Sequence, residues 1–222
     1  MKILLFGATG LAGGGVLRAC LDAPDVGDLR AVVRRSSGVG DAKLREIIHD
    51  NYLDYSAIAD AFAGVDACFF CLGASVTQVP DEADYRRIHR AFPLAAATLL
   101  REKSPSAVFH YLSGGRAELR SRWMWARVKA EAERDLMTQF EAVCWRPAMI
   151  DGEPFASQPA LTRALRPLLR AMFKPFRSMY VLNVDIGRAM LQATREHLRS
   201  RIVENAELRD FADRRRAEAG PT

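Results

Sequence analysis

The sequence predicts an α/β protein with a doubly wound, mostly parallel sheet of the Rossmann type, flanked by helices. Three observations lead to this fold class. Apolar runs alternate with longer amphipathic stretches from the first residue onward. The first run, Ile3-Leu4-Leu5-Phe6, is continuous rather than alternating, as expected for a strand that is buried on both faces. A glycine-rich turn then separates this run from the stretch that follows it.

The expected strands are short apolar segments bounded by glycine, proline or charged residues. They cover residues 2–6, 29–33, 44–49, 66–72, 107–112 and 141–145. The expected helices carry apolar residues at three- and four-residue spacing and follow the strands. They cover residues 10–21, 55–62, 83–101 with a bend at Pro93, 116–140, 161–173, 184–197 and 204–216. Strands that alternate with helices are typical of parallel strands joined by right-handed crossovers.

The chain has 222 residues, of which 49% are hydrophobic and 27% charged, and its formal net charge is +5. This length is ordinary for one α/β domain, so residues 1–222 are interpreted as a single dinucleotide-binding domain. No apolar run reaches the roughly 18 residues of a transmembrane helix. The first apolar run meets a glycine too early for a signal peptide. The sequence therefore predicts a cytoplasmic protein without a transmembrane segment.

The cysteines do not indicate a metal or redox site. Cys68 and Cys71 have the spacing of a CxxC pair, but they lie in an apolar run that is expected to form a strand. Residues three apart on a strand face opposite sides, and free cysteine is commonly buried. Both are interpreted as core residues, and no metal site is predicted.

Residues 157–180 contain no acidic side chain and five basic ones, namely Arg163, Arg166, Arg170, Lys174 and Arg177. Leucines and prolines interrupt them and no nucleic-acid reading motif accompanies them, so nucleic-acid binding is not expected. The stretch is interpreted as part of a small C-terminal cover over the substrate end, residues 148–182. The alternatives are a site for an acidic group and a peripheral contact with a membrane surface.

The turn Gly7-Ala8-Thr9-Gly10-Leu11-Ala12-Gly13 lies between the first strand and the first helix and is the strongest motif. The first glycine permits a tight turn, the second lets backbone N–H groups at the helix N-terminus approach a pyrophosphate, and the third allows close helix–strand packing. The expected cofactor contacts in this turn are Gly7, Thr9, Gly10, Leu11, Ala12 and Gly13.

The residues that follow the second strand indicate which dinucleotide binds. An acidic residue at this position would hold a ribose 2′-hydroxyl, but the sequence has Arg34 and Arg35. Guanidinium groups suit a 2′-phosphate because they form paired, charge-assisted hydrogen bonds. The sequence therefore predicts that NADP(H) is preferred over NAD(H). The alternative is that both arginines are simply solvated.

Further motifs at the ends of the expected strands and in the expected helices carry a family resemblance. They are Gly7-Ala8-Thr9-Gly10, Phe70-Cys71-Leu72-Gly73, Tyr111-Leu112-Ser113, Val128-Lys129-Ala130-Glu131, Trp145-Arg146-Pro147 and Val203-Glu204-Asn205-Ala206-Glu207. With them the chain, from Met1 to about Phe211, resembles the atypical short-chain dehydrogenase/reductase family. Within it, the Tat-interacting-protein-like group, with its NmrA-like and epimerase-like relatives, is the most similar. The resemblance implies these further cofactor contacts: Asn51 at the adenine, Leu72 and Gly73 under the ribose, and Pro147 and Ala148 at the nicotinamide end.

The resemblance also implies a catalytic Tyr-x-x-x-Lys pair on one helix face, in which the tyrosine is the general acid and the lysine binds the nicotinamide ribose. Here the run is Trp125 to Lys129, and an indole has no titratable proton near neutral pH. Of the two family serines after the fifth strand, Ser113 is present and Gly114 stands at the second position, which is usually the catalytic one. The candidate catalytic residues are therefore Lys129, Ser113 and Trp125.

Two functions of different classes follow from these residues. One is an NADP(H)-dependent reductase of a small carbonyl substrate, in which the proton comes from water or from another tyrosine, Tyr85 or Tyr180. The other is a catalytically inactive regulator that senses NADP(H) and acts through a protein partner, which requires a partner that distinguishes the loaded from the empty state. The fold alone does not separate them.

Overall fold

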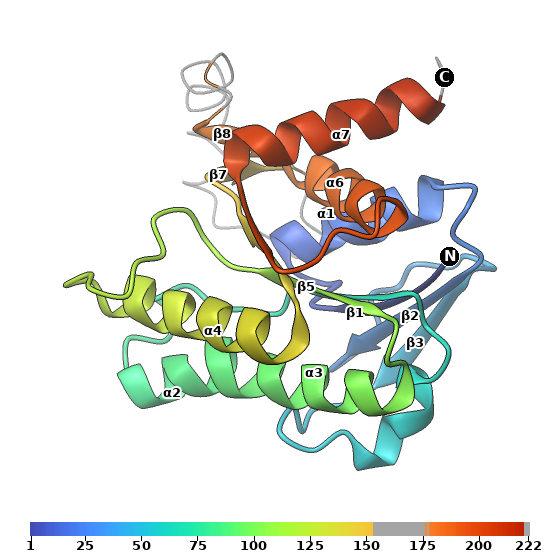
Figure 1. The fold of residues 1–222 in the computed structure, drawn as a ribbon. Helices are drawn as coiled ribbons and strands as arrows, with labels where there is room; N and C mark the ends of the chain where they lie inside the picture. The colour runs from blue at the N-terminus through green and yellow to red at the C-terminus, as the bar shows by residue number, and fades with distance from the viewer. Residues whose placement is uncertain (153–175, 177, 220–222) are drawn as a thin grey trace.

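The computed structural model describes residues 1–152, 176 and 178–219. A seven-stranded parallel sheet lies between two layers of helices (Figure 1), which confirms the predicted α/β fold class. The strands of the main sheet are β1 (Lys2–Phe6), β2 (Asp28–Val33), β3 (Leu44–Ile48), β4 (Ala67–Phe70), β5 (Val108–Leu112), β6 (Val143–Arg146) and β9 (Arg201–Glu204). A second sheet pairs β7 (Met149–Asp151) with β8 (Tyr180–Leu182) in parallel.

The strand order of the main sheet is β3-β2-β1-β4-β5-β6-β9, and every neighbouring pair is parallel. The chain moves from β1 outward to β2 and β3, then crosses back to β4 on the other side of β1. The loops after β1 and β4 consequently leave the sheet in different directions. Open α/β sheets bind ligands in the crevice at this switch point, beyond the carboxyl ends of the strands.

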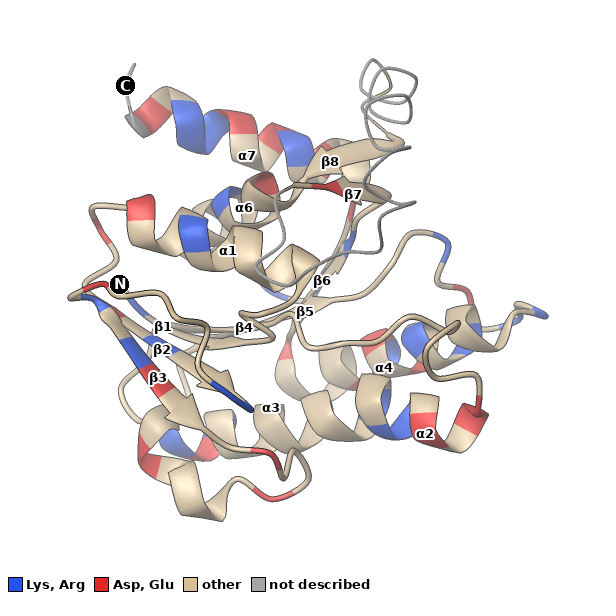
Figure 2. Cartoon of the chain, turned by 180° about the vertical axis from the view of Figure 1, so that it is seen from behind, with Lys and Arg blue, Asp and Glu red and all other residues tan. Residues whose placement is uncertain are grey.

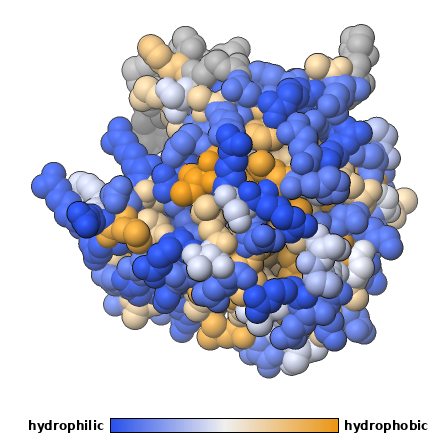
Figure 3. Space-filling view, viewed as in Figure 1, coloured by the Kyte–Doolittle hydropathy of each residue, from blue (hydrophilic) through white to orange (hydrophobic). Residues whose placement is uncertain are grey.

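Helices cover both faces of the sheet (Figure 1). One layer consists of α1 (Leu11–Asp22), α6 (Asn183–Arg195) and α7 (Asn205–Ala219). The other layer consists of the 3-10 helix η1 (Ser56–Phe62), α2 (Glu82–Arg86), the π turn η2 (Arg87–Ala91), α3 (Phe92–Lys103) and α4 (Met124–Phe140). Most of the face seen in Figure 3 is hydrophilic, since the outer sides of these elements meet solvent.

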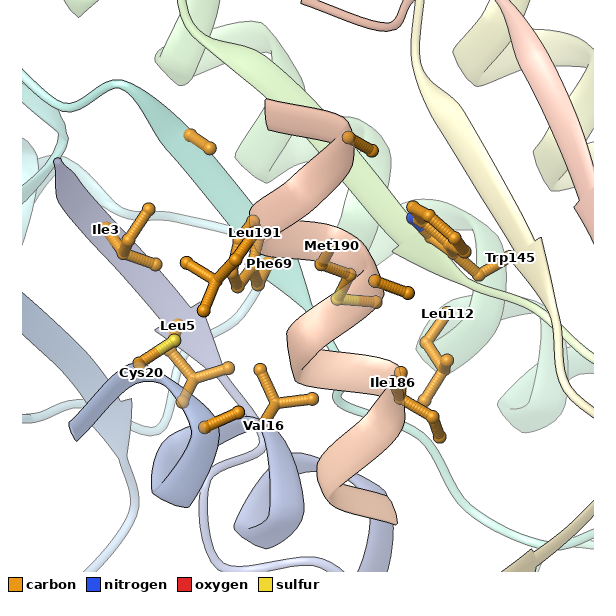
Figure 4. Packing of buried hydrophobic residues seen from close by; sticks show 14 of the residues in the cluster. Ile3, Leu5, Val16, Cys20, Phe69, Leu112, Trp145, Ile186, Met190 and Leu191 are labelled. Atoms are coloured by element: carbon orange, nitrogen blue, oxygen red, sulfur yellow. The ribbon is translucent and has the colours of Figure 1, made fainter. Parts of the chain in front are cut away.

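Two apolar clusters hold the layers together, because successive strand residues point to opposite faces. In β1, Ile3 and Leu5 join the cluster under α1 and α6, whereas Leu4 and Phe6 join the cluster over α3 and α4. Figure 4 shows the first cluster, in which side chains from the strands interlock with those of α1 and α6. Burial of this continuous apolar surface is the main stabilising contribution to such a fold.

The cysteine pair is divided between the two clusters. Cys68 is buried on the α3 side of the sheet, and Cys71, just after β4, packs against the cluster on the α1 side. Both are free thiols. The expected placement on opposite faces is confirmed, and Cys68 is a core residue, whereas Cys71 is only half-buried. In the part of the chain that the structure describes, no three side chains are grouped so that they could hold a metal ion.

The last helix is anchored by ion pairs. Basic and acidic residues alternate along α7 (Figure 2). Arg215 is buried and pairs with Asp25, which follows α1, and Arg216 pairs with Asp185 of α6. These contacts tie α7 to the α1 and α6 layer and complete the cover of that face.

The expected and the observed elements do not agree everywhere. The helix expected over 116–140 begins only at Met124, because the backbone of the residue before it, Trp123, is extended, with φ −80° and ψ 117°. The strand β9 has no counterpart in the prediction, since its apolar part is only Ile202 and Val203 between charged residues. The helix expected over 161–173, most of the expected cover 148–182 and the basic stretch 163–177 lie outside the described residues.

The helix expected over 83–101 contains a π turn before Pro93 rather than a simple bend. Proline has no N–H to donate to the carbonyl four residues earlier, which belongs to His89. The wider π turn accommodates the ring, and the Tyr111 hydroxyl donates to the freed His89 carbonyl oxygen at 2.8 Å. The proline thus fixes both the backbone and the position of His89.

A second buried histidine, His110, lies in β5 between two polar partners. Trp145 Nε1 donates to His110 Nδ1 at 3.0 Å, so the ring hydrogen is on Nε2, which lies 3.0 Å from Thr194 Oγ1. The Thr194 hydroxyl in turn donates to the Met190 carbonyl oxygen. Trp145, both ring nitrogens of His110 and the Thr194 hydroxyl therefore all have hydrogen-bond partners when the ring is neutral. Burial lowers the pKa of His110 to about 3.

This histidine is expected to make the fold sensitive to acid. Below about pH 6.5, His110 is protonated in the unfolded chain but stays neutral in the folded protein. The free energy of unfolding should therefore fall as the pH drops, by up to about 1.4 kcal/mol per pH unit. Urea unfolding from about pH 6 to about pH 4 measures this slope. The slope should be shallower in His110→Gln, which cannot titrate; an equal slope would assign the acid sensitivity to other groups.

Candidate functional site

The glycines after β1 have two different structural roles. At Gly7 φ is 81°, and a Cβ there would lie 2.6 Å from the Cys71 carbonyl carbon; at Gly13 it would lie 2.0 Å from the Gly7 carbonyl oxygen. These two glycines allow the turn to pack against the end of β4 and against α1. A Cβ on Gly10 would meet only the Gly7 carbonyl oxygen, at 3.3 Å. A side chain at position 10 therefore requires the Gly7 carbonyl oxygen to shift by a few tenths of an ångström, and it would lie at the N-cap of α1.

The N-terminus of α1 is available for an anion. Gly10 is its N-cap residue, no side chain caps the helix, and its first turn contains no acidic residue. The first N–H groups of a helix have no intrahelical partner, and the helix dipole favours negative charge beside them. Asn183 of α6 donates from Nδ2 to the Leu11 carbonyl oxygen at 2.8 Å, which steadies this first turn from the other side.

A cleft of about 510 Å³ extends from this turn along the ends of β2 and β4. Its lining residues are Gly7, Thr9, Gly10, Val32, Val33, Arg34, Arg35, Ser36, Ser37, Tyr52, Cys71, Leu72, Gly73 and Gln78. The structure thus brings together seven of the expected cofactor residues, namely Gly7, Thr9, Gly10, Arg34, Arg35, Leu72 and Gly73. Asn51 is not part of the lining: its Oδ1 accepts from the Leu53 N–H, and the neighbouring Tyr52 faces the cleft instead.

The wall formed by the end of β2 is basic. Arg34 and Arg35 are exposed, and neither forms an ion pair with any residue that the structure describes. Glu46 of the neighbouring strand β3 accepts from the Ser36 hydroxyl and the Ser37 N–H and so holds the turn after β2. No acidic side chain lines the described part of this cleft.

Two of the expected catalytic residues meet beyond β5. Lys129 Nζ donates to the Ser113 carbonyl oxygen at 2.7 Å, while the buried Ser113 Oγ has no hydrogen-bond partner among the described residues. Burial lowers the pKa of Lys129 to about 8, opposed by the charge of Glu133. A Cβ on Gly114 would lie 3.5 Å from Lys129 Cδ, so the absent side chain leaves the lysine stem open on this side.

Trp125, Pro147 and Ala148 were also expected near the nicotinamide. Trp125 is half-buried on α4, one helical turn before Lys129. The Pro147 carbonyl oxygen accepts from the Gly115 N–H, and the Ala148 N–H donates to Asn205 Oδ1. The backbone groups of residues 147 and 148 are thus already used to hold the loop after β6.

The two tyrosines considered as alternative acids differ. The Tyr180 hydroxyl donates to Asp151 Oδ2 at 2.6 Å and is held in that pair. Tyr85 is 2% exposed, and its ring lies 4.1 Å from that of His89, a residue that sequence reasoning missed. Burial raises the pKa of Tyr85 to about 12. Pro93, four residues after His89, is the sequence signal that could have drawn attention to it.

The fold defines a class, the Rossmann-type α/β proteins, and solved structures of short-chain dehydrogenases/reductases share this architecture. DesIV, a dTDP-glucose 4,6-dehydratase from Streptomyces venezuelae solved with NAD and TYD bound, matches with a TM-score of 0.68 and 13% identity over 100% of this chain and 82% of that one. An oxidoreductase of the short-chain dehydrogenase/reductase family from Burkholderia thailandensis matches with a TM-score of 0.68 and 15% identity, covering 93% and 92% of the two chains. The expected resemblance is thus confirmed at the level of the fold.

Sequence comparison finds more specific relatives. The chain is 25% identical to the mitochondrial protein FMP52 of Eremothecium gossypii over 217 residues, which cover 94% of this chain and 96% of that protein. It is 24% identical to fmp52 of Aspergillus fumigatus over 166 residues, 72% of this chain and 70% of that protein. No protein-family model matches the chain.

The cytoplasmic location predicted from the sequence is contradicted, since both of these relatives are named as mitochondrial proteins. The prediction rested on the absence of an apolar transmembrane run and of a secretory signal peptide, and neither absence distinguishes cytoplasm from mitochondria. Within the described residues, no helix is both long enough and apolar enough to cross a membrane.

Proposed function

We propose that this protein binds NADP(H) in preference to NAD(H) and reduces a small carbonyl compound. One observation carries the proposal: a single cleft joins the uncapped start of α1 to two arginines that pair with no described acidic residue, and its described walls hold no carboxylate. A dinucleotide has a pyrophosphate at its centre and, in NADP(H), a third phosphate on the adenine ribose. The cleft offers a group for each of these charges.

The residues fit such a ligand from end to end. The backbone N–H groups of Leu11 and Ala12 would hold the pyrophosphate, with no side chain at Gly10 to block it. Arg34, with Arg35 beside it, would bind the 2′-phosphate. Lys129, whose Nζ lies at the Ser113 carbonyl oxygen after β5 and which is not part of the cleft lining, would hold the ribose next to the nicotinamide.

A bound nicotinamide would supply the hydride for a carbonyl substrate. The chain supplies hydrogen bonds. Ser113 Oγ, which has no hydrogen-bond partner among the described residues, would donate to a carbonyl oxygen. Lys129 Nζ uses one hydrogen on the Ser113 carbonyl oxygen and keeps two for a ligand. The Trp125 indole can donate a hydrogen bond but cannot transfer a proton, so the final proton comes from water or from Lys129 through a bound water.

The cofactor preference is tested by Arg34→Asp. We expect NADPH to bind at least about tenfold more weakly, since a hydrogen bond to a charged group is worth about 1.5–3 kcal/mol, while NADH affinity changes little. Calorimetric titration of both cofactors measures this. Lys103→Asp, at the far end of α3, makes the same charge change and should leave both affinities as they are. Equal losses for NADPH and NADH in Arg34→Asp would refute the assignment.

The second candidate function, a regulator without turnover, is favoured by two observations: the residue four before Lys129 is Trp125, and the Tyr180 hydroxyl is held by Asp151. The two functions are separated by assaying aldehydes, ketones and quinones with NADPH. Consumption above background supports the reductase. No consumption, together with partner proteins that are captured only when NADP(H) is present, supports the regulator.

A further inference from the structure

His89 lies in the π turn η2 and is buried beneath Gly73, a residue that lines the cofactor cleft. Its side chain is 3% exposed and packs against the ring of Tyr85. Because Pro93 frees its carbonyl oxygen, that oxygen is held instead by the Tyr111 hydroxyl. Backbone and ring are therefore both fixed by neighbours.

One ring nitrogen holds the loop after β4. His89 Nε2 lies 2.9 Å from the Ala74 carbonyl oxygen and 3.3 Å from the Ala74 N–H nitrogen. The shorter contact assigns the ring hydrogen to Nε2, which donates to the carbonyl oxygen. A Cβ on Gly73 would lie 2.9 Å from His89 Cε1, so the ring sits directly beneath a residue that lines the cleft.

The other ring nitrogen is left as a buried acceptor. Burial lowers the pKa of His89 to about 3, so the ring is neutral and Nδ1 carries a lone pair. Nδ1 has no hydrogen-bond partner among the described residues. The charge of Lys129 is close enough to contribute to the lowered pKa of His89. The site therefore contains an unused acceptor beside an ammonium group that can only donate.

We propose that His89 Nδ1 accepts a hydrogen bond from a hydroxyl of the ribose next to the nicotinamide, while Lys129 donates to the same ribose. A sugar hydroxyl both donates and accepts, and Lys129 provides only donors. The tyrosine that the family resemblance implies could accept through its phenol oxygen, but Trp125 offers only an N–H. His89 supplies the missing acceptor from a different element, the π turn before Pro93.

The proposal rests on the proposed binding of NADP(H), and two ligands keep the two claims apart. NADPH contains the ribose in question, whereas 2′,5′-ADP carries the 2′-phosphate but lacks that ribose. Calorimetric titration of wild-type protein with both ligands comes first. If neither ligand binds, the proposed function is overturned and this inference with it.

Two substitutions then separate the two ring nitrogens. The amide of His89→Gln reaches the place of Nε2 and can still donate to the Ala74 carbonyl oxygen, but it leaves no acceptor at the place of Nδ1. We expect it to bind NADPH about tenfold more weakly and 2′,5′-ADP as tightly as the wild type does. The carboxamide oxygen of His89→Asn reaches the place of Nδ1, so NADPH affinity should be partly restored relative to His89→Gln.

Unchanged NADPH affinity in a folded His89→Gln variant would overturn the proposal. An equal loss for NADPH and 2′,5′-ADP would overturn it as well, because it would show a general disturbance of the cleft rather than loss of a ribose contact. Thermal unfolding of each variant establishes that it is folded. If His89→Gln does not fold, His89→Asn is compared with the wild type by the ratio of NADPH affinity to 2′,5′-ADP affinity. An unchanged ratio supports the proposal, and a ratio that is tenfold lower in His89→Asn overturns it.

Discussion

Gly10→Val is expected to weaken the binding of both NADPH and NADH by about 100-fold or more while the protein stays folded. The valine side chain projects over the start of α1, where the pyrophosphate would lie, and removes charge-assisted hydrogen bonds of about 1.5–3 kcal/mol each. The fold needs only a small shift for this change, because the added Cβ makes one tight contact, 3.3 Å to the Gly7 carbonyl oxygen, and the backbone at Gly10 is extended. Calorimetry with each cofactor measures the loss.

Two other glycines provide the controls. Gly27→Val adds the same side chain before β2, where a Cβ meets nothing within 4 Å, and should leave cofactor affinity unchanged. Gly13→Ala places a Cβ 2.0 Å from the Gly7 carbonyl oxygen and should instead lower the unfolding temperature. Unchanged affinity in folded Gly10→Val would show that the cofactor does not bind at this turn.

Trp125→Tyr is expected to create or raise NADPH-dependent reduction of small carbonyl compounds. It restores a tyrosine one helical turn before Lys129, whose burial-lowered pKa of about 8 leaves an ammonium beside the new phenol at neutral pH. General acid catalysis contributes about 10²–10⁴-fold in rate, which sets the upper limit of the gain. The gain from this single change should be smaller, because Gly114 leaves the usual serine position empty.

Trp125→Tyr combined with Gly114→Ser should exceed the product of the two single effects, since catalytic groups that act together are non-additive. The structure has room for the serine, because a Cβ at position 114 would lie 3.5 Å from Lys129 Cδ, an ordinary contact. The matched control is Trp123→Tyr, on an exposed tryptophan just before α4, which should change nothing. The readout is kcat with NADPH across a panel of aldehydes, ketones and quinones.

A double variant that binds NADPH, stays folded and reduces nothing in the panel would show that this is not a latent dehydrogenase site. The regulator function would then be the better account of the same residues. The preserved cleft and Lys129 would serve to sense the cofactor rather than to use it.

Some residues of the candidate site could be predicted from the local sequence pattern, and others could not. The turn from Gly7 to Gly13 and the pair Arg34 and Arg35 each follow directly from a strand, so their positions at the sheet edge follow from the chain order. Asn51 was expected in the cleft by resemblance alone, but its side chain closes a local turn and Tyr52 lines the wall instead. A short loop is set by hydrogen bonds that strand and helix patterns do not contain.

The sequence by itself determined the alternation of strands and helices, the parallel sheet and the glycine turn, because apolar periodicity and glycine placement act over a few neighbouring residues. Only the tertiary structure decided that β9, with two apolar residues, completes the sheet beside β6. It also decided that Lys129 reaches the Ser113 carbonyl oxygen and that His89 lies beneath Gly73. The first contact joins residues 16 positions apart in sequence, and the second depends on a π turn. Local preference does not determine such contacts. They form because a buried polar group without a hydrogen-bond partner is costly, so the folded chain brings partners together.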